Sequence, residues 1–453
     1  MQRRPLVLIS GKDVLEAGGH ESYVRAHALA AARIGFDPHI FCASSASRTQ
    51  RTDFGVIHHI AAPRHRTPPA ILQVPLPAQL PLLARGVAKF LAGRPGPHLI
   101  HSFSIFATAG VAASRALARR GVDATPVASA YATRAYEIGV MRDGLRAHHG
   151  LADRVRYRAW EHWVGLVDNP VEGWGYAGSS VVLVNYESVR RILVSAYGSR
   201  LNIRRVPYAA PNAFAGEHPV RGSIAGQVAT LDLPAAPLIV AVSRHDPRKG
   251  VDLLLLALAE VAAAGIPFRA CLVGAGKLLS SHRRLATRLG LDGRVALPGC
   301  VPDVAPYLSR GDIFVLPSLA ESSGSVSVLE ALRAGKPVIA SACDGLPEDL
   351  IDGRDALLVA PGDVSALAGA LKRLLADPAL RAQLALSAQA TYERRFTARG
   401  FVSALAEVYA ELGACAPRGA ALVGGPGGST QDTAKETYDV GPHTSAAAAE
   451  LAL

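Results

Sequence analysis

The sequence predicts an α/β protein made of two doubly wound parallel-sheet domains. In each half of the chain, short apolar runs alternate with stretches of helical periodicity, which is the pattern of βαβ units. The 453 residues are also more than one hydrophobic core usually organises. A composition with 49% hydrophobic and only 6% aromatic residues suits helices that pack on sheets.

The first half of the chain opens with a βαβ unit. PLVLIS is the first strand, and the helix after it should end at Gly35, because glycine commonly terminates helices. The run Pro63–Pro81 should be an ordered loop, and the periodicity blurs over 131–176. The remaining strands and helices of this half are expected in DPHIFCAS, HLIHSFS, residues 107–120, PVASAYA and SSVVLVNYESVRRILVSAYG.

The second half of the chain repeats the alternation more clearly. A loop-like stretch around 207–237 precedes it and suits a domain boundary. After residue 412 the sequence becomes rich in Gly, Ala, Ser and Thr, which predicts a disordered tail. The strands and helices in between are expected in PLIVAVSR, 251–264, FRACLVGAG, a helix to Leu289, VALPGCV, a short helix to Ser309, DIFVLPS, a helix from Val328, and KPVIASA.

Charge is distributed unevenly along the chain. The formal net charge is +11, and residues 1–205 hold 26 Lys and Arg against 13 Asp and Glu, whereas the remainder holds 22 against 24. A basic domain attracts phosphates, nucleic acid or acidic lipid headgroups. A compositional bias towards arginine would explain the same excess. Nucleic acid is not expected as a partner, because the sequence contains no recognised nucleic-acid-binding module.

The three tryptophans, Trp160, Trp163 and Trp174, lie among arginines in the region of blurred periodicity. Tryptophan beside arginine is used at membrane interfaces and acceptor-binding surfaces. A helix that packs its indole side chains onto the domain would show the same sequence pattern. No run of eighteen apolar residues is present, so no membrane-spanning helix is expected. The remaining hypothesis is peripheral contact with an anionic membrane that carries a lipid-linked acceptor.

The five cysteines indicate reduced thiols in a cytoplasmic protein. They are scattered, and no two have the spacing of metal ligands, so no metal site is expected. The apolar run Leu6–Ile9 after the opening basic residues is too short for a secretory signal. Contact with the inner face of the plasma membrane remains a further hypothesis. The cysteines are Cys42, Cys271, Cys300, Cys343 and Cys415.

Four segments at expected strand ends are candidates for a binding site, because ligands of parallel sheets bind at the carboxyl ends of the strands. In AGGHES, Gly18 and Gly19 would let a ligand approach the backbone and a helix N-terminus, although a plain turn explains them too. In VSRHDPRKGVD, Arg244 and Lys249 would suit a pyrophosphate, with a solvated basic loop as the alternative.

The third candidate segment is LPSLAESSGSVSVLEALRAGKPVIAS, which follows a buried strand with acids and small residues. Gly324 and Ser325 could offer backbone N–H groups to a phosphate. Glu321 and Glu330 could each hold hydroxyls of a polyol such as ribose, although an early helical acid is also favoured by the helix dipole. The fourth candidate is His101, which could donate to a phosphate or sugar, or could be a satisfied core histidine.

In this order, the segments resemble those of glycosyltransferase family 4, the retaining enzymes of the "glycosyl transferases group 1" type. The segments GGHESYVRAHALAAARIGFDPHIF, VSRHDPRKGVDLLLLAL, LVGAG, VALPGCV and LPSLAESSGSVSVLEALRAGKPVIAS are similar to that family's landmarks, as are GLPEDLIDGRDALLVAPGD and TYERRFTARGFVSALAEVYAEL. The resemblance implies the GT-B fold, in which two Rossmann-like domains face each other across a cleft. It also implies transfer of a sugar from a nucleoside diphosphate sugar, UDP- or GDP-linked, to a hydroxyl of a glycan, lipid-linked or small-molecule acceptor.

The resemblance implies a role for each candidate residue. Arg244 and Lys249 would bind the diphosphate and stabilise the leaving group, Glu330 would bind the ribose, and Glu321 would bind the donor sugar. Gly18 and Gly19 would lie beside the diphosphate, and the backbone at Cys300 and Val301 would face the base. His101, Gly324 and Ser325 complete the expected site. No cofactor and no metal are expected, because cations and helix dipoles stabilise the leaving diphosphate in such enzymes.

The resemblance also divides the chain into segments. An N-terminal acceptor-side domain would cover 1–206 and a linker 207–236. The nucleotide-sugar domain would cover 237–395, a helix over 396–413 would cross back to the first domain, and 414–453 would be the disordered tail.

The sequence departs from the family pattern at two positions. The acids usually stand eight residues apart, but Glu321 and Glu330 are nine apart. The strand at His101 often reads H-x-H, but here Phe103 takes the second place. The altered acid spacing leaves open a GT-B binding or scaffold protein with reduced catalysis. A GT-B nucleotide-sugar epimerase is a further alternative, which fits the acids but fits the GG-x-E opening less well.

Overall fold

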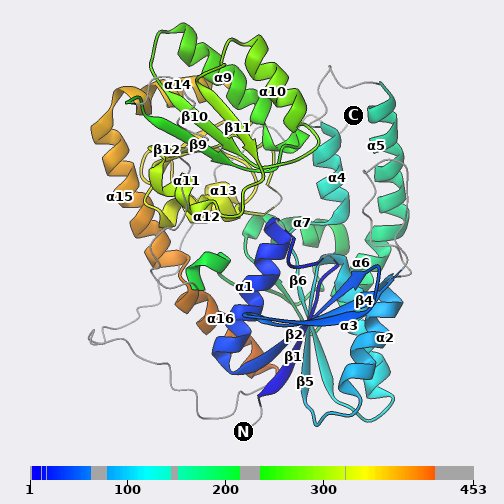
Figure 1. Ribbon diagram of the computed structural model, residues 1–453. Coiled ribbons are helices and arrows are strands. Elements are labelled where there is room, and N and C mark those ends of the chain that lie inside the picture. The colour runs from blue at the N-terminus through cyan, green and yellow to red at the C-terminus, as the bar shows by residue number, and fades with distance from the viewer. Residues whose placement is uncertain are drawn as a thin grey trace, which may run out of the picture. The chain divides into compact units, whose positions relative to one another are not determined.

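The computed structural model divides the chain into two units, Met1–Pro417 and Arg418–Leu453, and all described residues belong to the first (Figure 1). The second unit, together with the expected disordered tail, lies outside the described residues. The described residues are 3–11, 13–16, 18–62, 79–143, 151–214, 235–321 and 323–413.

The first unit contains an eight-stranded sheet in the order β3-β4-β2-β1-β5-β6-β7-β8. All neighbouring strands are parallel except β3 and β4. The chain winds outward from β1 on one side and then from β5 on the other, which is the doubly wound arrangement predicted. The strands are β1 (Arg4–Ile9), β2 (Phe36–Ser44), β3 (Arg48–Thr52), β4 (Gly55–Ala61), β5 (His98–Phe103), β6 (Ala124–Ser129), β7 (Val181–Val184) and β8 (Ile203–Arg205).

Helices cover this sheet. Helix α1 ends where expected, at Gly35, whose φ of 108° is left-handed. The helices are α1 (Gly19–Ile34), α2 (Gln79–Leu91), α3 (Ala107–Ala118), α4 (Arg134–Asp143), α5 (Leu151–Trp163), α6 (Asn169–Gly178) and α7 (Glu187–Tyr197), with short turns η1 (Ser104–Phe106), η2 (Val164–Asp168) and η3 (Pro211–Phe214).

The second sheet has six parallel strands in the order β11-β10-β9-β12-β13-β14. Its central strands, such as β12 and β13, are buried throughout, as their continuous apolar runs predict. The strands are β9 (Leu238–Val242), β10 (Arg269–Val273), β11 (Val295–Gly299), β12 (Ile313–Leu316), β13 (Val338–Ser341) and β14 (Ala356–Val359). The other elements are η4 (Pro247–Lys249), α9 (Val251–Ala263), α10 (Leu279–Arg288), α11 (Ala305–Arg310), α12 (Val326–Arg333), α13 (Leu346–Asp349), α14 (Val364–Ala376), α15 (Pro378–Arg395) and α16 (Ala398–Glu411).

Helix α16, the last that the structure describes, packs on the first sheet's helix α1 (Figure 1). The ring of Phe401 lies 4.9 Å from that of His27 in α1. Phe401 is fully buried in the core cluster that also contains strand residues such as Leu6. Helix α16 thereby contributes to the core that contains β1.

Some elements were not predicted from the sequence. The exposed hairpin strand β3 carries no apolar alternation, so its pattern did not reveal a strand. Most of Pro63–Pro81 lies outside the described residues, and α2 begins within its end. The stretch 131–176 contains α4, α5 and α6, with the π-helical turn η2 between the last two interrupting the regular period.

Candidate active site

Two loops at the carboxyl edge of the six-stranded sheet lie directly against each other. Gly250 follows η4 with a φ of 60°, and a Cβ there would lie 2.1 Å from the carbonyl oxygen of Pro317. Only glycine fits both this left-handed backbone and this close approach. The backbone N–H of Leu319 also donates to the carbonyl of Arg248 at 2.7 Å. The segment before α9 is therefore fixed against the segment after β12.

This contact brings two predicted residues together. The Lys249 ammonium lies 2.6 and 2.7 Å from the two carboxylate oxygens of Glu321. The side chains are 11% and 3% exposed, so the ion pair is buried. Ser318 also donates to this carboxylate. Burial lowers the pKa of Lys249 below its usual value, while Glu321 acts in the opposite direction.

Asp344, in the loop after β13, completes this cluster. One of its carboxylate oxygens accepts the backbone N–H of Glu321 at 2.6 Å, and the other accepts the hydroxyl of Tyr136 from α4. Asp344 has a φ of 49°, which is uncommon for a residue other than glycine and typical of functional loops. Neither Asp344 nor Tyr136 was predicted from the sequence, because nothing in the linear pattern joins them.

Gly324, in the loop before α12, lies against Tyr186, the residue before α7. A Cβ on Gly324 would lie 1.9 Å from the Tyr186 hydroxyl oxygen. That hydroxyl donates to Asp349 at 2.6 Å. Ser325 precedes α12, is buried, and hydrogen-bonds through its hydroxyl to that of Ser327 at 3.0 Å. The small residues of this loop therefore accommodate an aromatic side chain from the other sheet's elements.

Glu348, the neighbour of Asp349, caps a helix from a distant part of the sequence. Its carboxylate oxygens accept the backbone N–H groups of Glu187 and Ser188, each at 2.8 Å. These N–H groups belong to the first turn of α7, where no residue of the same helix can accept them. Arg205, at the end of β8, lies 3.4 Å from the same carboxylate.

Glu330 lies in α12 in a partly buried position with mixed charges around it. Its pKa is raised to about 7, mainly by burial and further by Asp303, while Arg25 and Arg333 oppose the shift. Arg25 belongs to α1, whose first residue is Gly19. Through Arg25, Glu330 is therefore coupled electrostatically to α1, the helix that begins at the Gly18–Gly19 pair.

The remaining phosphate-binding candidates are less enclosed. Arg244 is about half exposed and pairs with Asp246 at 3.3 Å rather than with the Lys249 cluster. Gly19 has open space where a Cβ would stand, whereas a Cβ on Gly18 would lie 2.0 Å from a carboxylate oxygen of Glu21. Only at Gly19 does the backbone of this loop have the open approach that the sequence predicts for both.

The predicted base-binding and histidine positions lie apart from the ion pair. Cys300 is exposed and Val301 partly buried in the loop after β11. His101 is fully buried in β5, where its ring nitrogens hydrogen-bond to Tyr409 at 2.7 Å and Ser129 at 2.8 Å. Both ring nitrogens are thus partnered inside the fold. His101 is a satisfied core histidine in this structure, which is the alternative that the sequence left open.

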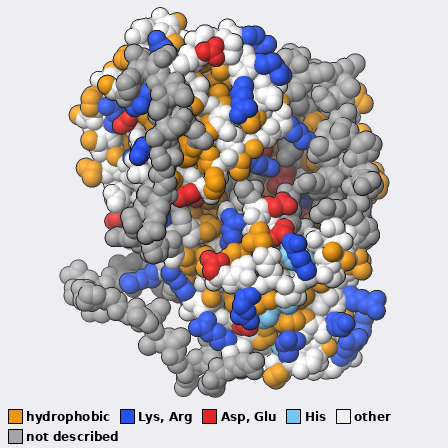
Figure 2. All heavy atoms as spheres, in the orientation of Figure 1, with side chains coloured by type: hydrophobic (Ala, Val, Ile, Leu, Met, Phe, Trp, Pro, Cys, Tyr) orange, Lys and Arg blue, Asp and Glu red, His pale blue; other side chains and the backbone are white. Residues whose placement is uncertain are grey.

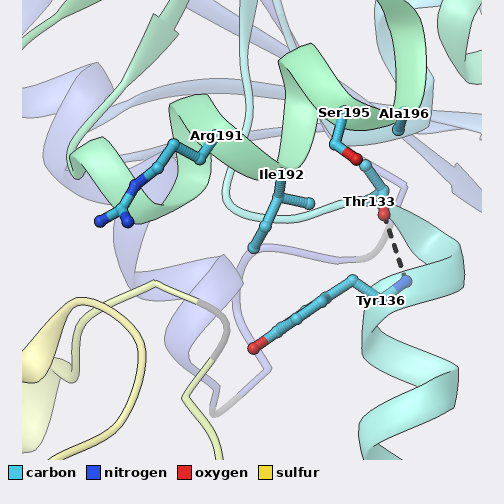
Figure 3. A pocket seen from close by; sticks show the side chains of 6 residues that line it. All are labelled: Thr133, Tyr136, Arg191, Ile192, Ser195 and Ala196. Carbon is cyan, nitrogen blue, oxygen red and sulfur yellow. Dashed lines mark hydrogen bonds between the residues drawn. The ribbon is translucent and has the colours of Figure 1, made fainter. Parts of the chain in front are cut away.

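A hollow of about 450 Å³ lies beside Tyr136, between α4 and α7 (Figure 3). Ile192 points toward the Tyr136 ring, and the side chain of Arg191 points away from it. The Thr133 hydroxyl accepts the backbone N–H of Tyr136 at 3.1 Å, which fixes the start of α4. The lining residues are Thr133, Tyr136, Arg191, Ile192, Ser195 and Ala196.

The surface of the first sheet's part of the chain is basic and partly apolar. Figure 2 shows Lys and Arg side chains gathered on its lower half, with fewer acidic ones among them. The side chains of Trp163, Leu166 and Trp174 are 52%, 77% and 40% exposed, and Arg115 lies over the Trp174 ring. None of the helices that the structure describes combines the length and the apolar character that crossing a bilayer requires.

Residues 236–377 match the family model of the glycosyl transferases group 1. This segment contains Lys249, Glu321, Asp344 and Glu330, so the matched region is the one that builds the ion-pair cluster. Over 183 residues the chain is 33% identical to the lipopolysaccharide core biosynthesis glycosyltransferase LpsE of Rhizobium meliloti, covering 40% of this chain and 52% of that protein.

A second relative and a solved structure extend this similarity. The chain is 33% identical over 150 residues to a GDP-mannose-dependent phosphatidylinositol monomannoside mannosyltransferase of Mycolicibacterium smegmatis, covering 31% of this chain and 39% of that protein. The sucrose-phosphate synthase of Thermosynechococcus elongatus superposes with a TM-score of 0.69 at 25% identity, covering 91% of this chain and all of that one. The fold is that of GT-B glycosyltransferases. The chain spans about half the length, or less, of these curated relatives.

Proposed function

We propose that this chain is a retaining glycosyltransferase of family 4 that moves a sugar from a nucleoside diphosphate sugar to an acceptor hydroxyl. The observation that carries this proposal is the buried Lys249–Glu321 ion pair at the carboxyl edge of the six-stranded sheet. A cation and a carboxylate at a strand edge suit a ligand with both phosphates and sugar hydroxyls. Relatives in the matched region are glycosyltransferases, one of them GDP-mannose-dependent, which favours a UDP- or GDP-sugar.

The proposed reaction requires charge stabilisation on the leaving diphosphate. Lys249 carries three N–H donors and directs two toward Glu321, which leaves one for a phosphate oxygen. Arg244, half exposed on the same loop, would reach the diphosphate from its other side. These cations would stabilise the negative charge that develops as the bond between the anomeric carbon and the phosphate oxygen breaks, without a metal ion.

Retention would follow from substitution on one face of the sugar. The acceptor oxygen would bond to the anomeric carbon on the face that the diphosphate leaves, and the acceptor proton would pass to a departing phosphate oxygen. Glu321 would hold donor-sugar hydroxyls and Glu330 the ribose. The backbone of Gly18 and Gly19 would approach the diphosphate.

The remaining donor contacts would come from two loops. The N-terminus of α12, at Gly324 and Ser325, would receive a phosphate, and the loop at Cys300 and Val301 would receive the base. Moving Tyr186 away from Gly324 would open the first of these positions.

We assign the hollow between α4 and α7 to the acceptor. Tyr136 lines this hollow and also hydrogen-bonds to Asp344, which holds the backbone of Glu321. Two hydrogen-bonded side chains, those of Tyr136 and Asp344, would connect an acceptor bound there to Glu321, the proposed donor-sugar contact. The aromatic ring of Tyr136 and the hydroxyls of Thr133 and Ser195 suit a sugar, which presents both apolar C–H and polar O–H groups.

The exposed aromatic surface suggests where an acceptor could be presented. Trp163 and Leu166 stand on adjacent turns at the end of α5 and in η2, in a domain with a basic excess. Aromatic and basic side chains together favour peripheral binding to anionic bilayers, here on the cytoplasmic face of the plasma membrane. In liposome sedimentation, we expect more protein with anionic than with neutral vesicles. Equal recovery with both would contradict this part of the proposal.

The alternative function is a binding or scaffold protein, favoured by the nine-residue interval between Glu321 and Glu330. Donor hydrolysis measured across UDP-, GDP- and ADP-sugars separates the two functions. A transferase should release the nucleoside diphosphate from at least one donor, and the Lys249→Met variant should not. A protein whose melting temperature rises with a donor, but which never turns it over, would be a binding protein.

A further inference from the structure

A second cluster of chemically active side chains lies at the carboxyl edge of the eight-stranded sheet. Cys42 and His59 are register partners on the parallel neighbours β2 and β4, so the backbone fixes them side by side. Asp13 follows β1, the other neighbour of β2. Their potential ligand atoms all lie within 4.8 Å of one another. The linear spacing of the three residues did not predict this cluster, because three separate strands assemble it.

Two of the three distances between ligand atoms are close to those of a tetrahedral zinc site. The Sγ atom of Cys42 lies 3.5 Å from Nδ1 of His59, and that nitrogen lies 3.7 Å from Oδ2 of Asp13. Zinc bonds of about 2.3 Å to sulfur and about 2.0–2.2 Å to nitrogen or oxygen, at tetrahedral angles, place ligand atoms about 3.4–3.6 Å apart. We propose that Asp13, Cys42 and His59 form a binding site for a divalent transition metal of the zinc type.

The surroundings of the cluster suit a bound cation. Cys42 and His59 are buried, whereas the Asp13 side chain is 23% exposed, which provides a route of entry and room for water as a fourth ligand. The other Asp13 oxygen accepts the N–H of Leu15 at 3.1 Å, and this bond holds Oδ2 toward His59.

Among the described residues, a basic side chain, that of Arg48, faces the cluster. Arg48 lies 3.5 Å from Oδ2 of Asp13, and its side chain is 58% exposed. In the metal-free protein, Arg48 therefore neutralises part of the Asp13 charge. An exposed ion pair contributes little free energy, so a divalent cation can displace Arg48 from Asp13. A reactive cysteine is the competing explanation for the cluster, but Cys42 is inaccessible, as its complete burial shows.

A metal here would act on a loop rather than on the transfer reaction. The loop 13–16 leads to Gly18 and Gly19, and Arg25 already holds it by donating to the carbonyls of Val14 at 2.5 Å and Glu16 at 3.2 Å. A metal bound to Asp13 would add a second anchor, from the sheet itself. This inference stands apart from the proposed transfer reaction, in which no metal takes part.

Metal binding by the full chain tests the proposal directly. After treatment with a chelator, the protein is titrated with Co²⁺, whose bond to a thiolate gives a charge-transfer band in the near ultraviolet, and then with Zn²⁺ in competition. We expect one equivalent of Co²⁺ with a thiolate band, displaced by Zn²⁺, and a melting temperature that rises with Zn²⁺. Absence of binding at tens of micromolar metal would overturn the proposal.

Variants locate the bound metal. Cys42→Ala should lose the thiolate band, and His59→Ala should weaken binding at least tenfold. The controls Cys300→Ser and His58→Gln, which change an exposed thiol and the neighbouring histidine, should bind as the unchanged protein does. Cys42→Ala and His59→Ala change buried residues and could fail to fold. In that case Asp13→Asn, at a partly exposed position, still tests the site, because it should weaken Co²⁺ binding about tenfold or more. A band that survives Cys42→Ala, or an Asp13→Asn variant with unchanged affinity, would refute the site.

Discussion

Lys249 and Glu321 form a buried ion pair in which the ammonium nitrogen lies 2.6 and 2.7 Å from the two carboxylate oxygens. The residues are 72 positions apart in sequence and meet because Gly250 allows their two loops to touch. The pair is both a structural element and the centre of the proposed donor site. Substitutions here therefore affect stability and turnover together, and an informative experiment must separate the two.

Lys249→Met should destabilise the protein and abolish turnover. Removing one partner of a buried pair leaves an uncompensated charge, which costs about 3–5 kcal/mol in free energy of unfolding. Loss of a cation at the leaving diphosphate should lower turnover by about 100-fold or more. Urea unfolding and donor hydrolysis measure the two effects.

The double variant Lys249→Met, Glu321→Leu separates stability from function. With both charges replaced by apolar groups, most of the lost stability should return, because no charge is left buried alone. Turnover should stay absent. Recovery of turnover together with stability would show that the pair has only a structural role.

Glu330→Gln should stabilise the ligand-free protein above pH 7 and weaken donor binding. Burial raises the pKa of Glu330 from its ordinary value of 4.5 to about 7. Between these values the folded state holds a proton that the unfolded state has released. The stability of the unsubstituted protein should therefore fall by up to about 1.4 kcal/mol per pH unit over this window as pH rises, and level off above it.

The difference in unfolding free energy between the unsubstituted protein and Glu330→Gln, measured from pH 4.5 to 8, isolates this group. Burial also raises the pKa of Glu172 and Asp349 to about 7, but their contributions cancel in the difference. The affinity for the donor should drop by about 10–100-fold, since hydrogen bonds from ribose to a carboxylate are lost. A pH-independent difference, or unchanged donor affinity, would refute the respective claim.

Glu348→Ala should cost about 1–2 kcal/mol of stability, because two N–H groups at the start of α7 lose their acceptor. Glu407→Ala is the matched control: Glu407 is exposed and lies 3.8 Å from Arg204, so its loss should cost less than about 1 kcal/mol. Urea unfolding of both variants measures the effect. Equal losses would mean that the Glu348 bonds do not contribute.

The sequence predicted the βα alternation well because strands buried on both faces read as continuous apolar runs. Lys249, Glu321 and Glu330 were chosen as site residues because strand-end loops carry the chemistry of parallel sheets, and their roles stay predictions. The sequence did not predict the partners of these residues. Tyr136, Tyr186 and Asp344 contact the site through tertiary packing, for which a single sequence has no local signal.

The surroundings of a strand-end residue are likewise set by tertiary packing. His101 stands near the end of a strand, as predicted, but Tyr409 from the last helix covers it and bonds to its ring. Whether a strand-end residue faces a ligand or the core depends on which element packs over it. The Cys42–His59 pair was overlooked for the same reason, because strand register rather than linear spacing joins the two residues.

Ile192→Trp should block the acceptor while leaving the donor in place. Ile192 points into the hollow of about 450 Å³ beside Tyr136, and an indole there would fill much of the space that a sugar needs. Transfer to the acceptor should fall at least tenfold, whereas donor hydrolysis and nucleoside diphosphate binding should change little. Leu386→Trp, on an exposed position of α15, introduces the same side chain away from the hollow and should leave both reactions intact. If Ile192→Trp reduces hydrolysis and transfer equally, the hollow belongs to the donor or to the fold, and the acceptor must bind elsewhere.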